Sequence, residues 1–506
     1  MKRKLYLPLT LALVMAFASG CEDYLDINFD PSNPQVAEGF ALLPPILSQM
    51  VRGESFDTRY VGQYVQNWAS TATNNVWDQH GYQAGSDAGG EKWRSHYWSI
   101  GKNIDLIIEQ ATPKEQWDYI GVAKAIRAWS WQTTTDVNGE MILRQAWEPN
   151  RYVFDFDPQQ DVYAEVERLC MEALDDLARS DGGVSQAGLA RGDLVYAGDR
   201  AKWTKFVYSV LARNAHHVSN KSSYNPDKVI EYCDLSLASN ADNFNVPHAG
   251  TNSADGNFFG PVRNNLRTYR QSTYIVSLLD GTVFGGVVDP RLSKMLTESP
   301  DMVYRGVTPT LGDTTNVNNN PRRIPLLWGV APTVTNAAQI PGKYIFTNNA
   351  PHPLATYSEI QFIKAEAAFI KGNKGMAYDA FRNGIIAHMD FAGVAAADRD
   401  AYLASAAVPQ NGTDLKISDI MLQKYISLWI HGALETWVDM RRYRYSSDVY
   451  TGFKLPTTFF LDNSGKPAYR LRPRYNSEYV WNRESLNTFG GNNPDYHTYE
   501  LWFMQP

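Results

Sequence analysis

The residues that could do chemistry are scattered along this 506-residue chain, and their spacing matches no catalytic signature. The sequence has no His-Glu-x-x-His zinc motif, no Gly-x-Ser-x-Gly nucleophile turn and no Walker lysine motif. The adjacent pair His216-His217 ends an expected helix, where we expect solvated or capping roles rather than metal binding. Composition alone does not rule out a carboxylate pair for glycoside hydrolysis. We therefore predict a binding protein rather than an enzyme, without metal or cofactor.

A sugar-binding site needs no reactive group, only ring faces for stacking and planar polar groups for hydroxyls. Aromatic residues in loops are stronger functional candidates than aromatic residues in a core. The candidate rings are Trp77, Tyr82, Phe258, Phe259, Tyr269, Tyr304 and Trp328. The candidate polar partners are Asn74, Asn75, Asp78, Asn257, Arg263 and Arg267. Packing of each residue within its own loop is the competing interpretation.

These candidates predict a ligand face built from the loop 71–90 and the segment 250–330. Trp77 is the first choice as a stacking platform, because this large ring lies in a polar loop with no helical stripe to absorb it. Trp328 is the second choice, since core packing with Leu326 and Leu327 competes there.

The N-terminus carries the clearest chemical signal. Lys2, Arg3 and Lys4 precede an apolar run over 5–17, and Ala18-Ser19-Gly20-Cys21 follows. This is the pattern of a secretory signal that ends at a cysteine acylated in bacterial lipoproteins. An ordinary signal peptide with a coincidental cysteine is the alternative. We expect a signal peptide over 1–20 and a lipid-anchored tether over 21–40, with Cys21 multiply acylated for stable anchoring.

Bulk composition limits the partners. The net charge of −7 becomes −10 when the basic leader is removed, which argues against nucleic acid and anionic lipid surfaces. No later stretch approaches eighteen consecutive apolar residues, so lipid is the only membrane contact that we expect. Cys170 and Cys233 lie at apolar helical spacing, which favours two buried thiols and leaves one disulfide between them open.

Periodicity predicts helices that position these residues. The expected helices cover 41–53, 60–69, 91–110, 117–135, 161–178, 199–218, 227–239, 357–370, 376–385 and 417–442. Trp93, Tyr97 and Ile100 begin an apolar stripe, whereas Trp98 lies off it and needs a second helix or a ligand as partner. Short turns between helices with small contact residues indicate tetratricopeptide-like pairs: 117–135 with 161–178, 199–218 with 227–239, and 357–370 with 376–385.

The segment 240–353 is rich in Pro, Gly and Asn, which excludes long helices and predicts a loop-rich insertion with short helices at 273–280 and 291–297. We expect one domain over 41–506. Its helical-repeat scaffold covers about 91–239 and 357–442, and its loop-rich tail covers 443–506.

Five stretches together give the chain a resemblance to SusD/RagB-type nutrient-binding outer-membrane lipoproteins of the Bacteroidetes kind. The stretches are the leader cysteine with Tyr24-Leu25-Asp26-Ile27-Asn28, the segment 358–368, the segment 423–429, the segment 435–442 and the segment 472–482. The resemblance implies an all-α, SusD-like fold on four tetratricopeptide-like helix pairs, with a loop-rich ligand-binding half. It also implies structural roles for Glu359, Glu366, Trp437 and Arg441.

The same resemblance implies a lipid-anchored protein at the outer membrane, exposed on the cell surface. Its partner would be a SusC-like TonB-dependent transporter, to which it delivers nutrient cargo. Aromatic loops favour glycan cargo, a RagB-like peptide cargo is the first alternative, and an adhesin or scaffold without a transport role is the second.

Overall fold

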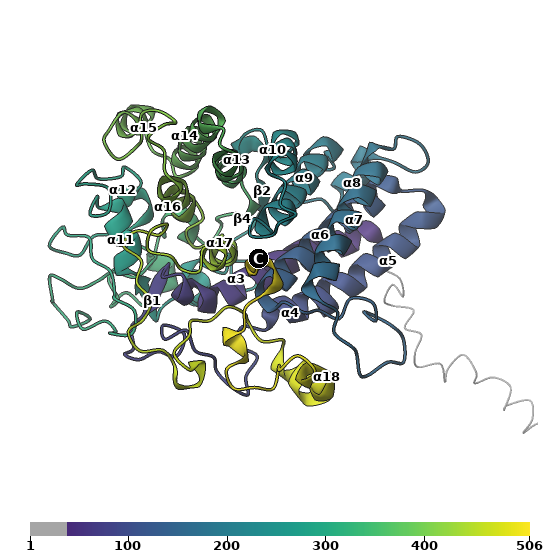
Figure 1. Ribbon diagram of the computed structural model, residues 1–506, viewed down its shortest axis with the longest axis horizontal. Helices are drawn as coiled ribbons and strands as arrows, with labels where there is room; N and C mark the ends of the chain where they lie inside the picture. Colours follow the sequence, from purple (N-terminus) through teal and green to yellow (C-terminus); the bar gives the residue numbers. More distant parts are fainter. Residues whose placement is uncertain (1–37) are drawn as a thin grey trace, which may run out of the picture.

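The computed structural model describes residues 38–506, so Cys21 and the leader lie outside the described residues. Within 38–506, no helix combines the length and apolar character that crossing a membrane requires. In this described part of the chain, helices dominate, and the strands form two small antiparallel sheets of two strands each (Figure 1). The predicted all-α class is confirmed.

Successive helix pairs form the scaffold (Figure 1). α6 (Trp117–Asn138) packs on α7 (Gln159–Ala178), α9 (Arg200–His217) packs on α10 (Pro226–Leu235), and α13 (Tyr357–Lys371) packs on α14 (Lys374–Phe391). Contacts of α7 with α9, and of α10 with α13, join the pairs into one array. The three predicted pairings are confirmed.

Local sequence explains where these helices begin and end. Asp199 caps α9 by accepting hydrogen bonds from the amides of Ala201 and Lys202, as its position predicts. Gly372 ends α13 with a φ of 86°, and Asn373 then caps α14. Glycine avoids the strain that a Cβ brings at this φ, so two helices can be joined by a two-residue turn.

Buried ion pairs fasten the array, as the family resemblance implies. Glu366 of α13 accepts from Arg442 of α17 (Ala433–Arg442) at 2.8 and 3.1 Å, and both side chains are almost fully buried. Trp437 and Arg441 are fully buried too. Removing one member of such a pair leaves an unpaired buried charge, which is strongly destabilising.

The first helix differs from the prediction of two segments. A single helix, α3 (Gly39–Tyr64), runs through Pro44 and Pro45, and the chain then forms strand β1 (Trp68–Ser70) rather than continuing as helix. The two predicted helices left residues 54–59 outside. In the structure these residues are helical, and Asp57 among them accepts hydrogen bonds from the amides of Glu91 and Lys92. These bonds allow the Asp57 carboxylate to be buried within the helix. Their donors lie far along the chain, so the local sequence pattern does not indicate them.

The predicted helix over 91–110 is divided into three parts. α4 (Glu91–Arg94) leads into a π-helical turn, Ser95–Gly101, which leads into α5 (Lys102–Ala111). The expected apolar stripe holds, since Trp93, Ile100, Ile104 and Ile107 are buried. Trp98 is 69 % exposed, so its predicted position off the stripe is confirmed.

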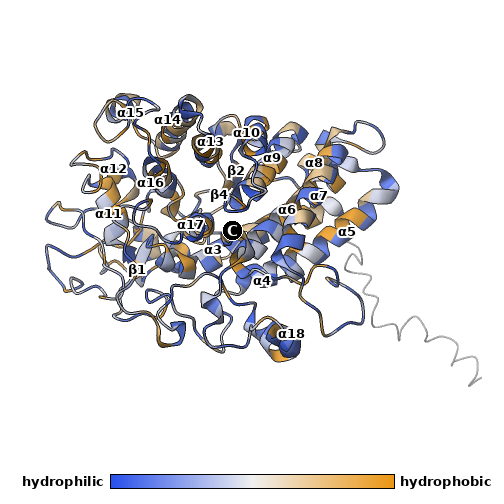
Figure 2. Ribbon diagram, viewed as in Figure 1, coloured by the Kyte–Doolittle hydropathy of each residue, from blue (hydrophilic) through white to orange (hydrophobic). Residues whose placement is uncertain are grey.

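The loop-rich insertion contains α11 (Thr273–Leu279) and α12 (Leu292–Met295), close to the two short helices predicted. Its strand β3 (Tyr269–Gln271) pairs antiparallel with β1, and β2 (Phe244–Val246) pairs with β4 (His352–Ala355). The β2–β4 pair joins the two ends of the insertion to each other, and the β1–β3 pair attaches its middle to the chain that follows α3. Figure 2 shows the outer loops of this region largely in the blue of hydrophilic residues.

The C-terminal part returns along the scaffold. α16 (Ile417–Ser427) and α17 are separate helices, because Ile430 adopts a φ of 74° between them, where one continuous helix was expected. The remaining helices α8 (Gln186–Ala190), α15 (Ala396–Leu403) and α18 (Arg483–Asn487) are short. Cys170 and Cys233 are both buried and free, so the open disulfide alternative is wrong.

Candidate functional site

The two rings expected to act as stacking platforms lie in the core. Trp77 is 3 % exposed and packs against Tyr60, Tyr64 and Tyr82. Trp328 is 1 % exposed and donates its indole N–H to the Phe259 carbonyl at 2.7 Å. The expectation that these rings stand free for a ligand is wrong, because neighbouring elements that the sequence does not reveal cover both faces.

Most of the other predicted ligand residues also have internal roles, whereas Asn74 is exposed. Buried rings are Tyr82, Phe258, Phe259 and Tyr269. Asp78 accepts hydrogen bonds from the amides of Ser70 and Thr310, and its pKa is raised to about 7 because burial outweighs those bonds. Arg267 donates to the carbonyls of Pro332 and Val334. Asn75 accepts from the Trp77 amide, while Asn74 takes a φ of 50° in the same loop.

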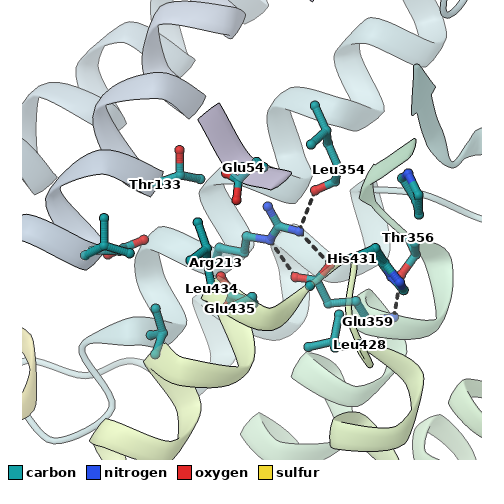
Figure 3. A pocket seen from close by; sticks show the side chains of 15 residues that line it. Glu54, Thr133, Arg213, Leu354, Thr356, Glu359, Leu428, His431, Leu434 and Glu435 are labelled. Carbon is teal, nitrogen blue, oxygen red and sulfur yellow. Dashed lines mark hydrogen bonds and ion pairs between the residues drawn. The ribbon is translucent and has the colours of Figure 1, made fainter. Parts of the chain in front are cut away.

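An enclosed polar pocket lies between α9, α13 and α17 (Figure 3). The Arg213 guanidinium makes a bidentate pair with Glu359 at 2.5 and 2.6 Å and also donates to the Leu354 carbonyl. The cavity measures only about 30 Å³, which is room for water but not for a sugar. Its side chains therefore hold the helices together rather than bind a ligand.

The histidine pair predicted to be solvated or capping is buried instead. His216 lies 2.8 Å from Glu366. His217 lies between two carboxylates, with its Nε2 2.7 Å from Glu435 and its Nδ1 3.2 Å from Asp136. Burial lowers the His217 pKa, but the two carboxylates outweigh it and raise the pKa to about 9. At neutral pH His217 is therefore protonated, and its positive charge lies between the carboxylates of Asp136 and Glu435. The same three residues lie close enough together to form a set of possible metal ligands.

An open pocket of about 680 Å³ lies elsewhere. Three chain segments build it: the helical run 93–102, the loop 142–154 after α6, and the tail segment 474–478. Figure 1 shows α18 below α4 and close to the loop that follows α6. This volume is within the range of small-molecule sites in proteins.

The backbone around this open pocket is unusual in three places. Both Ser95–Gly101 and Tyr475–Tyr479 are π-helical turns, which occur often at functional sites. Trp147 holds a φ of 62°, a conformation that bulky residues rarely adopt. Its indole N–H donates to the Tyr97 carbonyl at 2.7 Å, so the loop is fixed to the first π turn. Backbone strain of this kind concentrates at functional sites.

Trp98 is the feature of this pocket most suited to a ligand. It lies within the first π turn, lines the pocket and is 69 % exposed, whereas Trp93 beside it is buried. Its position off the apolar stripe was the sequence signal for this role. The other pocket residues carried no signal, because they come from distant segments that only folding brings together.

The arginines that line this pocket are paired with carboxylates. Arg94 pairs with Glu91, Arg151 with Glu148, and Arg474 with Asp87, at N–O distances of 3.2, 2.5 and 2.9 Å. The buried carboxylate of Glu478 accepts hydrogen bonds from the indole N–H of Trp93 and from the side-chain amide of Asn482. Burial raises the Glu478 pKa despite those two bonds. Each of these three guanidinium groups has a counter-charge, whereas Lys102, which also lines the pocket, has no ion-pair partner within the described residues.

Comparison with known proteins agrees with this architecture. A family model for SusD-like proteins, described as starch-binding and associating with the outer membrane, matches residues 31–453. The chain therefore belongs to the SusD-like family. No curated protein matches the sequence.

Solved structures share the fold at low identity. A SusD/RagB family protein from Bacteroides thetaiotaomicron has 19 % identity and a TM-score of 0.70, over 92 % of this chain and 99 % of that one. A chitin-binding SusD homologue from Flavobacterium johnsoniae has 17 % identity and a TM-score of 0.70, over 92 % and 98 %. Another chitin-binding protein has 22 % identity and a TM-score of 0.70, over 93 % and 100 %.

Proposed function

We propose that this protein is a cell-surface lipoprotein that binds a neutral glycan in the open pocket and delivers it to a SusC-like TonB-dependent transporter. The observation that carries the proposal is the exposed Trp98 ring on the wall of a 680 Å³ pocket rimmed by paired guanidinium and carboxylate groups. We further propose that the chain is not an enzyme.

The chemistry of the pocket supports a sugar. An exposed indole face can stack on the C–H-rich face of a pyranose ring, and paired Arg and Glu side chains can donate to and accept from hydroxyl groups. The pairing of Arg94, Arg151 and Arg474 weakens their attraction for an anionic ligand, because each of these three groups has a carboxylate beside it, and it leaves Lys102 as the one unpaired cation among the described lining residues. The family description and the chitin-binding relatives support the same ligand class.

Anchoring and transport rest on sequence and family. Cys21 follows a lipoprotein-type leader, and the family is described as associating with the outer membrane. A tethered binder does not by itself move cargo through a membrane, so it requires a transporter. Pull-down from native membranes in mild detergent is expected to recover a TonB-dependent barrel, and repeated recovery of this chain alone would favour the adhesin alternative.

The ligand class is tested by screening the soluble chain that lacks residues 1–21. Neutral oligosaccharide arrays and peptide libraries are compared, with the Trp98→Ala variant as the matched control for the pocket. We expect glycan binding that the variant loses. Binding to peptides alone would contradict the proposal and support a RagB-like cargo.

A further inference from the structure

The three most exposed aromatic side chains of residues 38–506 lie in the chain segments around one pocket. Trp98, Tyr152 and Trp481 are 69, 82 and 73 % exposed. Trp98 lines the open pocket, whereas Tyr152 lies in the loop 142–154 and Trp481 lies three residues after the tail segment 474–478, and neither of these two lines the pocket. Large rings exposed together mark an interaction surface.

The segments that carry Tyr152 and Trp481 are fastened to each other. The Phe154 amide donates to Asn482 Oδ1 at 2.9 Å, and Asn482 Nδ2 donates to the Phe154 carbonyl at 2.9 Å. Phe154 lines the pocket, and so does Glu478, three residues before Trp481. The reciprocal bonds therefore hold the two segments that carry these exposed rings together beside the pocket.

We propose that Tyr152 and Trp481 form an outer subsite, which stacks on the part of a linear glycan that extends beyond the pocket. The proposal rests on the proposed function and deepens it. The ligand it implies is an oligosaccharide longer than the pocket, with flat, C–H-rich ring faces, such as a β-1,4-linked chain with equatorial hydroxyl groups. Trp98 holds the sugar units inside the pocket, and the outer rings hold the units that follow.

A glycan suits this surface better than a protein partner does. Besides the two rings, the apolar surface here comes only from Val153 and Val480, which are 52 and 48 % exposed. A stable protein interface buries roughly 800 Å² on each partner, with an apolar centre, and four side chains supply only a fraction of that area. Single rings separated by polar groups, such as the exposed Arg151–Glu148 pair, match a chain of sugar units instead.

Chain-length dependence of binding tests the outer subsite. The protein is purified with its N-terminal segment intact, as wild type and as the Tyr152→Ala, Trp481→Ala and double variants. Leu461→Ala is the control, because Leu461 is 90 % exposed and does not line the pocket. Calorimetry compares a disaccharide with a hexasaccharide in the chitin, cellulose, xylan, mannan and amylose series.

For the series that binds, each ring variant is expected to lower hexasaccharide affinity by about threefold to tenfold, which is the usual worth of one aromatic contact. Disaccharide affinity stays unchanged, as does the melting temperature, since both rings are exposed. Equal affinity of wild type and double variant for the hexasaccharide overturns the outer subsite alone. Failure of the wild type to bind any series overturns the proposed function, and the outer subsite with it.

Discussion

Gly101 lies so close to Trp147 that a Cβ atom on the glycine would come within 2.1 Å of the indole Cζ2. The glycine ends the first π turn, and the indole lies on the wall of the open pocket. The shape of this wall therefore depends on a residue without a side chain.

Gly101→Ala should displace the Trp147 ring and the loop that carries it. We expect a loss of about 1–3 kcal/mol in the free energy of unfolding, because overpacking a well-filled site costs this much, together with weaker glycan binding. Chemical denaturation and calorimetry measure both effects. Gly375→Ala is the control, since its Cβ meets only Asn373 Oδ1 at 3.9 Å near the start of α14. Equal stability of Gly101→Ala and wild type would contradict the close packing.

The hydrogen-bonded connection between the tail and the loop after α6 can be broken at one residue. Asn482 is 3 % exposed, and its side chain bonds to Phe154 and Glu478. Asn482→Ala leaves those buried groups without partners, so we expect a loss of about 1–3 kcal/mol in stability and weaker binding. Thermal unfolding and calorimetry measure these. A variant with unchanged stability would show that the bonds do not hold the pocket edge.

The ion pair between Arg213 and Glu359 should stabilise the array only as a pair. Glu359→Gln removes the carboxylate that is hydrogen-bonded to the buried Arg213 guanidinium, which is expected to cost about 3–5 kcal/mol. The double variant Arg213→Met with Glu359→Gln should lose much less than the sum of the two single changes. Denaturant titration of the four proteins gives the coupling energy. Additive losses would mean that the two charges do not interact.

His217 should make stability depend on pH above neutrality. Its pKa is raised to about 9 in the folded protein, although burial lowers it, because Glu435 and Asp136 favour the charged form. A raised pKa adds stability that is complete below the ordinary value of about 6.5 and is lost as the pH rises to about 9. The stability difference between wild type and His217→Gln should therefore shrink across that window. A difference that is constant with pH would contradict a protonated His217.

Helix pairing was predictable because the two helices of each pair are close together in the sequence. Their periodicity, capping residues and small contact residues are all visible in it. Asp199 and Gly372 are examples in which one residue type sets a boundary. The single helix α3 was not predictable in this way, since the carboxylate of Asp57 is satisfied by amides of α4, far along the chain.

The site was harder to predict for the same reason. Trp77 lies in a polar loop and Trp328 in the loop-rich insertion, yet both rings are covered by other parts of the chain, such as Tyr60 and Tyr64 of α3 over Trp77. Trp98 gave a local signal, because a ring off the apolar stripe of its helix must meet solvent or a partner. Tyr152 and Trp481 gave none, since the segments that carry them are joined only in the fold, through the bonds between Phe154 and Asn482.

The central claim is that Trp98 holds a glycan in the open pocket, and calorimetry on Trp98→Ala tests it most directly. The titrant is the oligosaccharide that the glycan screen selects, and Leu461→Ala is the exposed control. The account predicts that Trp98→Ala lowers affinity about tenfold or more, while its melting temperature and the affinity of the control remain those of wild type. Wild-type affinity in a well-folded Trp98→Ala protein would contradict the account and move the glycan away from this pocket.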